Sequence, residues 1–189
     1  MRDDSAFRET YGSILEEIRS ALDLVDPVQV TALVGAIAGA EQVFCVGVGR
    51  VMLCLKAFSK RLNHLGIASF CVGDINEPAI SERDLLIVGS GSGESAVPVA
   101  IARIARTHRA KIAHIGSNCA SSLAPLTDIF LRIPTSTKLA LPGELVSRQP
   151  MTNLFDQTLY LLCDAITMLI IRDGGISLAG LWKRHANLE

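Results

Sequence analysis

The chain has no surplus of positive charge and no clustering of histidine or cysteine. Its 189 residues carry 18 Lys and Arg against 19 Asp and Glu, a balance that argues against a nucleic-acid binder, which needs a basic patch. The four histidines never fall in a metal-ligand spacing such as H-x-x-x-H, so no metal site is predicted. The five cysteines form no C-x-x-C pair and mostly lie in apolar segments, which indicates reduced core thiols in a cytoplasmic protein.

Signals for export or membrane insertion are also missing. The first five residues, M-R-D-D-S, are acidic and polar, so no secretory signal is predicted. The longest apolar run, residues 159–171, is interrupted by Asp164 and is too short to span a bilayer. With 49% hydrophobic residues and a mean hydropathy of +0.37, the chain is apolar for its size. We therefore expect part of its surface to be hidden by self-association, in a homodimer or homotetramer.

Strands and helices alternate along most of the chain. Two helices are expected within residues 5–39, and a polar tail is expected over 173–189. Between them, over 42–172, the pattern predicts strands at 42–46, 67–72, 85–88, 111–115 and 128–133, and helices at 51–64, 95–107 and 150–172. Such alternation predicts one α/β domain over 1–189, with a five-stranded parallel sheet in a three-layer αβα sandwich. Ligands of such sheets bind at the carboxyl ends of the strands.

The segment that joins the third strand to its helix is the most informative. Residues 84–95 read D-L-L-I-V-G-S-G-S-G-E-S, so three glycines alternate with serines and Ser95 opens the helix. Backbone N–H groups, serine hydroxyls and the positive end of the helix dipole then converge on one small volume. This arrangement predicts a phosphate cradle built without a lysine, suited to a sugar phosphate or a nucleotide. The alternative is an ordinary turn that needs glycine for backbone freedom.

Other motifs for phosphate binding or for a catalytic nucleophile are incomplete or absent. Gly47-Val48-Gly49 follows a strand, but Met52 occupies the third glycine position of a dinucleotide-binding fingerprint. No Gly-Lys-Ser/Thr sequence is present, which excludes a Walker A loop. Residues 89–93 match G-x-S-x-G, but no histidine and acid are placed to complete a hydrolase triad.

Residues 90–95, S-G-S-G-E-S, resemble the S-x-S-G-x-S/T loop of the sugar isomerase (SIS) domain family, and within it the chain is most similar to the 6-phospho-3-hexuloisomerases. The resemblance covers nearly the whole chain and includes G-V-G-R at 47–50, R-L-N-H-L-G at 61–66, the turn at 73–78 and the ending R-H-A-N-L-E at 184–189. It implies a flavodoxin-like fold and a phosphosugar isomerase without metal or organic cofactor. Two positions depart from the family pattern: Val51 stands where a serine is usual, and Asp156 where a glutamate is usual.

The resemblance further implies interconversion of 3-hexulose 6-phosphate and fructose 6-phosphate through a cis-enediol. One carboxylate can move the proton between C2 and C3. Asp156 is the expected base, with Glu144 as its substitute; the alternative for Asp156 is an acid that favours the first turns of its helix. Expected donors to the enediolate are Arg50, His64 and His185, the last in a tail able to reach a neighbouring subunit.

The expected substrate contacts are the glycine loops and the serines: Gly47, Gly49, Ser90, Gly91, Ser92, Gly93 and Ser95. Two other functions stay open at this point. One is a sensor that binds a phosphosugar without turnover, and the other is an isomerase of a different phosphosugar. Neither nucleic acid nor membrane is an expected partner.

Overall fold

A computed structural model describes residues 4–188 and contains the expected parallel sheet. The strands are β1 (Val43–Val46), β2 (Ser69–Cys71), β3 (Leu85–Gly89), β4 (Lys111–Gly116) and β5 (Ile129–Arg132). All neighbouring pairs are parallel, in the order β2-β1-β3-β4-β5. This flavodoxin-like order confirms the predicted fold class and places the topological switch point between β1 and β3.

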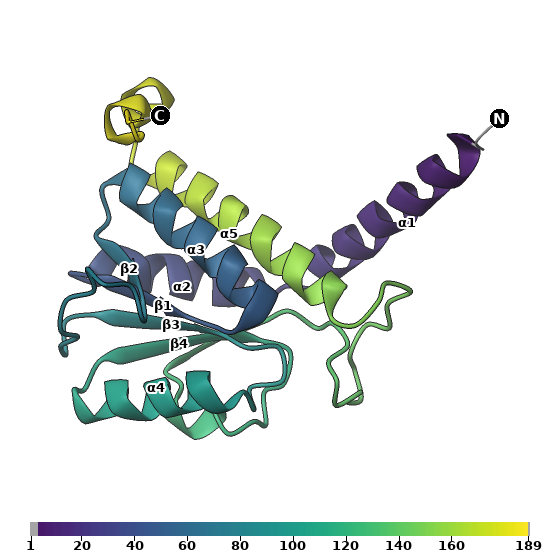
Figure 1. Ribbon diagram of the computed structural model, residues 1–189, viewed down its shortest axis with the longest axis horizontal. Coiled ribbons are helices and arrows are strands. Elements are labelled where there is room, and N and C mark those ends of the chain that lie inside the picture. The colour runs from purple at the N-terminus through teal and green to yellow at the C-terminus, as the bar shows by residue number, and fades with distance from the viewer. Residues whose placement is uncertain (1–3, 189) are drawn as a thin grey trace.

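Five α-helices and two short 3-10 turns complete the described chain. The helices are α1 (Asp4–Asp23), α2 (Pro27–Gly39), α3 (Gly49–Leu65), α4 (Ala96–Thr107) and α5 (Asn153–Asp173), and the 3-10 turns are η1 (Ala124–Leu126) and η2 (Leu178–Arg184). Figure 1 shows α2, α3 and α5 on one side of the sheet and α4 on the other, which is the three-layer arrangement.

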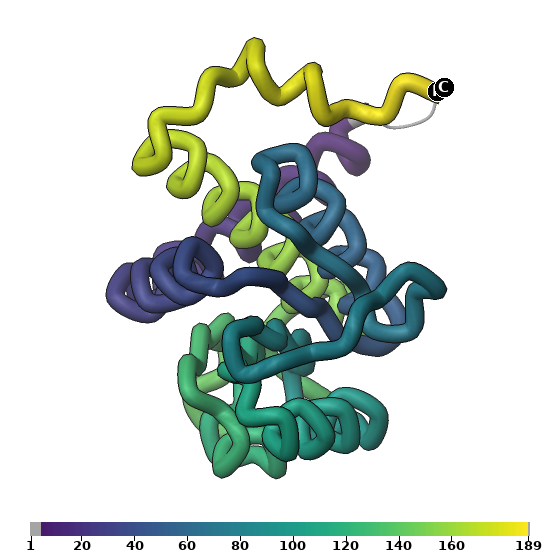
Figure 2. The backbone as a smooth tube through the Cα atoms, turned by 90° about the vertical axis from the view of Figure 1, so that its left-hand side faces the viewer, coloured from purple at the N-terminus to yellow at the C-terminus, as the bar shows by residue number. Residues whose placement is uncertain are grey.

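Element ends differ from the sequence prediction where backbone turns intervene. The strand expected at 67–72 is only β2, because Ile67 N–H donates to the Leu62 carbonyl (3.0 Å) and closes the end of α3 over the left-handed Gly66. Helix α5 begins at 153 rather than 150, after Met151 adopts a positive φ of 55°. The expected polar tail contains η2, which packs against α3. Figure 2 shows this segment beyond the end of α3.

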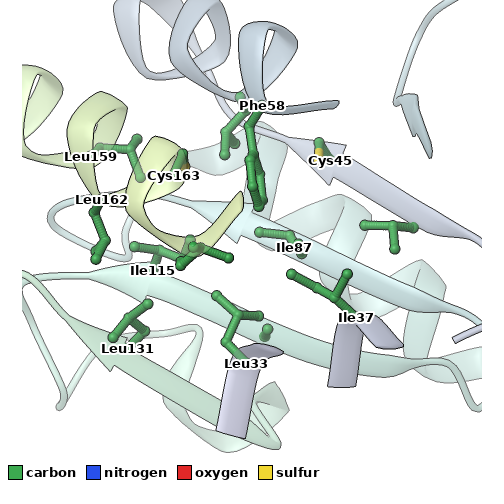
Figure 3. Packing of buried hydrophobic residues seen from close by; sticks show 14 of the residues in the cluster. Leu33, Ile37, Cys45, Phe58, Ile87, Ile115, Leu131, Leu159, Leu162 and Cys163 are labelled. Carbon is green, nitrogen blue, oxygen red and sulfur yellow. The ribbon is translucent and has the colours of Figure 1, made fainter. Parts of the chain in front are cut away.

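The sheet separates two apolar cores. Alternate strand residues, including Cys45, Ile87 and Ile115, face α2, α3 and α5 in the larger core (Figure 3). Their neighbours in the strands face α4 in the smaller core. Because both faces are covered, every residue of β1 and β3 is buried, which explains their uninterrupted apolar sequence.

Helix α5 owes its apolar character to this core. Within residues 4–188 it is the one unbent helix long and apolar enough to span a membrane, with a mean hydropathy of 1.6 over its most apolar window. However, 56% of that window is buried inside the fold. Core packing thus accounts for its composition.

Helix α1 projects away from the body of the molecule (Figure 1). Only its last turns are packed, through Ile18 and Ala21 against Leu154 at the start of α5. Elsewhere on this helix, Phe7 and Leu15 are exposed at 71% and 58%. Helix α1 therefore presents apolar side chains to its surroundings.

Candidate active site

A cavity of about 440 Å³ opens at the carboxyl edge of the sheet, beside the switch point. It collects four segments that are far apart in the sequence: the start of α3, the turn after β3, the loop between β5 and α5, and the first turn of α5. Its lining residues are Val48, Arg50, Val51, Gly89, Ser90, Gly91, Ser92, Ser95, Thr137, Lys138, Met151, Thr152, Asn153, Phe155 and Asp156. Parallel strands end together at this edge, which is why the loops that follow them meet.

The turn after β3, residues 90–93, is held with its carbonyls turned toward the protein. The carbonyls of Ser90, Gly91 and Ser92 each accept a hydrogen bond from a neighbouring donor: His114 Nε2 (2.9 Å), Ser117 N (2.9 Å) and Asn118 Nδ2 (3.1 Å), respectively. Within residues 4–188 the N–H groups of Gly91, Ser92 and Ser95 donate to no protein acceptor. Such a turn, with satisfied carbonyls and free N–H groups at a helix start, is suited to an anion.

Two glycines allow the turn to lie this close to β4. Gly93 has a φ of +68°, and a Cβ there would collide with the Ser121 side chain. A Cβ on Gly116 would collide with the ring of His114 and lie 2.5 Å from the Ser90 carbonyl oxygen. The buried His114 ring must carry its proton on Nε2, because its partner, the Ser90 carbonyl, can only accept. Burial lowers the pKa of His114, so this ring is neutral.

Asp156 and Arg50, which both line the cavity, form an ion pair. Arg50 Nε donates to Asp156 Oδ2 at 2.9 Å, although 106 residues separate the two. The Asp156 side chain is 5% exposed and the Arg50 side chain 64%. Oδ1 of Asp156 is buried without a hydrogen-bond partner among the described residues. Burial raises the pKa of Asp156 above its ordinary value of 3.8, and the hydrogen bond and charge of Arg50 offset part of that rise.

A carboxylate that lines the cavity can accept a proton from a substrate bound there. Its raised pKa makes it a stronger base than an ordinary aspartate. The adjacent wall is apolar, since Val48, Val51 and Phe155 also line the cavity. Val51, where the family pattern has serine, therefore lies in this wall.

The loop between β5 and α5 contributes residues that sequence reasoning missed. Thr137, Lys138 and Asn153 all line the cavity. The cavity thus contains a lysine, whereas the sequence predicted a cradle built without one. No periodic pattern marks this loop, and its only sequence signal is its length before a helix that begins at the site.

Glu144, the expected substitute base, is engaged within the same loop and does not line the cavity. Its carboxylate accepts from Thr137 N (2.9 Å), Thr137 Oγ1 (2.9 Å) and Leu141 N (3.0 Å). Its hydrogen-bonding capacity is thereby used to shape the loop.

Some of the expected site residues do not line this cavity. Gly47, Gly49 and Gly93 flank the cavity without lining it. The rings of His64 and His185 stack on each other, with centroids 5.4 Å apart, at the far end of α3. At about 1.5 Å per residue, α3 separates His64 from Arg50 by about 21 Å. Burial, followed by the charges of Arg61 and Lys60, lowers the pKa of His64.

Within residues 4–188 no group of three or more His, Cys, Asp or Glu side chains is placed to hold a metal ion. Of the cysteines, Cys119 is exposed and the other four are buried. The polar groups of the residues that line the cavity include hydroxyls, backbone N–H groups, the Asn153 amide, two cationic side chains and one carboxylate.

Comparisons with known proteins give matches over most of the chain. The SIS domain model matches residues 36–165. The chain is 34% identical over 181 residues to the 3-hexulose-6-phosphate isomerase of Bacillus subtilis, covering 96% of this chain and 98% of the relative. It is 37% identical over 176 residues to the enzyme of that name from Mycobacterium gastri, covering 93% and 88%. A Methanococcus jannaschii protein, whose crystal structure led to an inferred function of 3-hexulose-6-phosphate isomerase, superposes with a TM-score of 0.82 at 26% identity, covering 96% of this chain and 99% of that protein.

Proposed function

Because the chain belongs to the SIS domain family, we propose that it is a phosphosugar isomerase that interconverts 3-hexulose 6-phosphate and fructose 6-phosphate. One observation carries the proposal: the Asp156 carboxylate and the free N–H groups of Gly91 and Ser92 belong to residues that line one cavity. The relatives named for this reaction match the chain over nearly its full length. A volume of about 440 Å³ is of the size that binds a small metabolite.

The reaction needs a base, an electrostatic partner for the enediolate, and an anchor for the phosphate. In the proposed mechanism the phosphate group binds at Ser90, Ser92 and Ser95, where backbone N–H groups and the start of α4 face the cavity. Asp156 takes the proton from C2 of the hexulose and returns it to C3, through a cis-enediol. Arg50 orients the carboxylate and stabilises negative charge on the two enediolate oxygens. Binding the remote phosphate helps the chemistry because it fixes the reacting carbons relative to the base.

His64 and His185 require a different placement if they act on the substrate. They lie too far from Asp156 to share its cavity, so we propose that they act at the cavity of a neighbouring subunit. Support comes from Nε2 of His64, which is buried without a partner among the described residues. The protein is then a cytoplasmic homodimer or homotetramer, and the exposed Phe7 and Leu15 of α1 are suited to its interface.

Exchange of a substrate proton with solvent tests the reaction directly. Fructose 6-phosphate is incubated with the protein in deuterated water and followed by proton NMR. We expect the C3 proton to exchange, because the reverse reaction removes it to form the enediol. Exchange at C1 would instead indicate a ketose–aldose isomerase. A rise in Tm with fructose 6-phosphate but no exchange would identify a phosphosugar sensor and overturn the proposal.

Subunit mixing tests the placement of the histidines. Sedimentation equilibrium should first give a dimer or tetramer. Mixed oligomers of Asp156→Asn and His64→Ala chains should then regain part of the activity that each variant lacks, because one cavity in the mixture combines both native residues. A monomer, or no recovery on mixing, would exclude a shared site.

A further inference from the structure

Two cationic side chains line the cavity, and they differ in whether they form an ion pair. Arg50 is paired with the Asp156 carboxylate at 2.9 Å. Lys138 is exposed and takes part in none of the ion pairs formed within residues 4–188, although it lines the cavity. Within the described residues its charge is therefore not neutralised by a direct ion pair.

Two observations place the Lys138 ammonium group near the turn at 90–93. First, Lys138 and residues of the turn line the same cavity. Glu94, which directly follows that turn, accepts hydrogen bonds from the Ser122 hydroxyl and N–H, and these lower its pKa; the charge of Lys138 lowers it further. Lys138 and the turn thus belong to the same end of the cavity.

The loop that holds Lys138 leaves the edge of the sheet and is held in shape by hydrogen bonds between its own residues. At its base, Leu145 N–H donates to the Pro134 carbonyl (2.7 Å) and Ser136 N–H to the Leu145 carbonyl (3.0 Å). Next to this base, the Glu144 carboxylate accepts hydrogen bonds from both Thr137 and Leu141, as described above, and from Ser117 Oγ at 3.3 Å. Lys138 follows Thr137 directly, so the position of its backbone is fixed by the Glu144 carboxylate.

We propose that Lys138 binds the phosphate group of the substrate beside the turn at 90–93, and that Glu144 is the positioning residue that holds the loop for it. The inference rests on the proposed function for the identity of the phosphosugar. A phosphate monoester carries a charge of about −1.5 to −2 at neutral pH. The turn offers it neutral donors, and the charge of Arg50 is balanced by Asp156, so Lys138 supplies the remaining compensation.

The test compares Lys138→Gln with Lys138→Arg and with the matched control Lys111→Gln. Lys111 is an exposed lysine at the first residue of β4, on the opposite edge of the sheet. Isothermal calorimetry measures the affinity for fructose 6-phosphate, and the isomerase assay measures kcat and KM. We expect Lys138→Gln to raise Kd and KM by about tenfold, the effect of one charge-assisted hydrogen bond, with kcat little changed. Lys138→Arg should recover most of the affinity, and Lys111→Gln should behave like the wild type.

Salt provides a second measurement on the same proteins. The wild-type Kd for fructose 6-phosphate should rise with ionic strength, because the lysine–phosphate attraction is screened. The rise should be weaker in Lys138→Gln. An unchanged Kd in this variant, or a loss of kcat at unchanged KM, would overturn the proposal, since Lys138 would then act elsewhere or on the reacting carbons.

Glu144→Gln tests the positioning role. One oxygen of Glu144 accepts from two N–H groups and the other from two hydroxyls, so Glu144→Gln replaces a charged acceptor by a neutral amide and weakens these contacts. We expect the variant to raise KM in the same direction as Lys138→Gln, and the double variant to be no worse than Lys138→Gln alone. A fall in kcat with KM unchanged would instead make Glu144 a base. Should Glu144→Gln fail to fold, Lys138→Gln still decides the phosphate contact.

The two proposals fail in different ways. If the wild type binds fructose 6-phosphate but exchanges no proton, the isomerase function is wrong, and the calorimetric comparison of Lys138→Gln still tests the phosphate contact. If the wild type catalyses exchange while Lys138→Gln binds and reacts normally, the function stands and the Lys138 inference is wrong.

Discussion

Replacement of Asp156 by asparagine separates catalysis from stability at one position. The change keeps the shape of the side chain but removes its charge and its capacity to accept a proton. Loss of a general base typically costs 10²–10⁴-fold in rate, so we expect kcat to fall by about 10³-fold, equivalent to about 4 kcal/mol of activation free energy. KM should change little, because in the proposed mechanism the turn at 90–93, and not Asp156, binds the phosphate.

The same change should leave the fold intact. The pKa of Asp156 is raised in the folded protein, so its contribution to stability is fully present below the unfolded-state pKa of about 3.9 and is lost as the pH rises through the folded-state pKa. At neutral pH the wild type therefore carries an unfavourable buried charge with one unpartnered oxygen. We expect the free energy of unfolding of Asp156→Asn at pH 7 to equal or exceed that of the wild type, within about 1 kcal/mol. Its relative advantage should shrink toward pH 3.

Urea unfolding at several pH values and the isomerase assay measure both effects. Asp164→Asn is the matched control, because Asp164 is an exposed carboxylate on the same helix. A kcat of the Asp156 variant within tenfold of the wild type would refute the base assignment. Combined loss of activity and of several kcal/mol of stability would show instead that the carboxylate has a structural role.

Three further changes test the surroundings of the site. Ser90→Ala removes a hydroxyl at the turn and should weaken fructose 6-phosphate binding by about 1–3 kcal/mol in calorimetry; unchanged affinity would place the phosphate elsewhere. Gly116→Ala puts a Cβ 2.5 Å from the Ser90 carbonyl and should cost about 1–3 kcal/mol in urea unfolding, whereas Gly12→Ala, with no neighbour within 4 Å, should not destabilise the protein. Arg50→Gln removes the contacts that hold down the pKa of Asp156, so the acid limb of the kcat–pH profile should move to higher pH; a limb that stays in place would contradict the assigned ion pair.

Hydrophobic patterning sufficed to predict the fold class. The strands read as short apolar runs because helices cover both faces of the sheet, and the glycines and capping residues mark where each helix begins or ends. The ends of elements were less predictable. Ile67 continues the apolar run of β2 in the sequence. Its N–H nevertheless donates to the last turn of α3, because the left-handed conformation of Gly66 turns the chain back toward that helix.

The sequence by itself determined the parallel sheet and the glycine–serine turn at its edge, because burial periodicity, glycine and the helix dipole act over a few neighbouring residues. Only the tertiary structure decided which distant side chains share the cavity. It paired Arg50 with Asp156, brought Lys138 to the cavity that the turn at 90–93 also lines, engaged Glu144 in its own loop, and left His64 at the far end of α3. The physical reason for the first three is that individual side-chain contacts, such as those that shape the loop before α5, produce no periodic pattern in the sequence. The reason for the last is that the two ends of a long helix lie far apart.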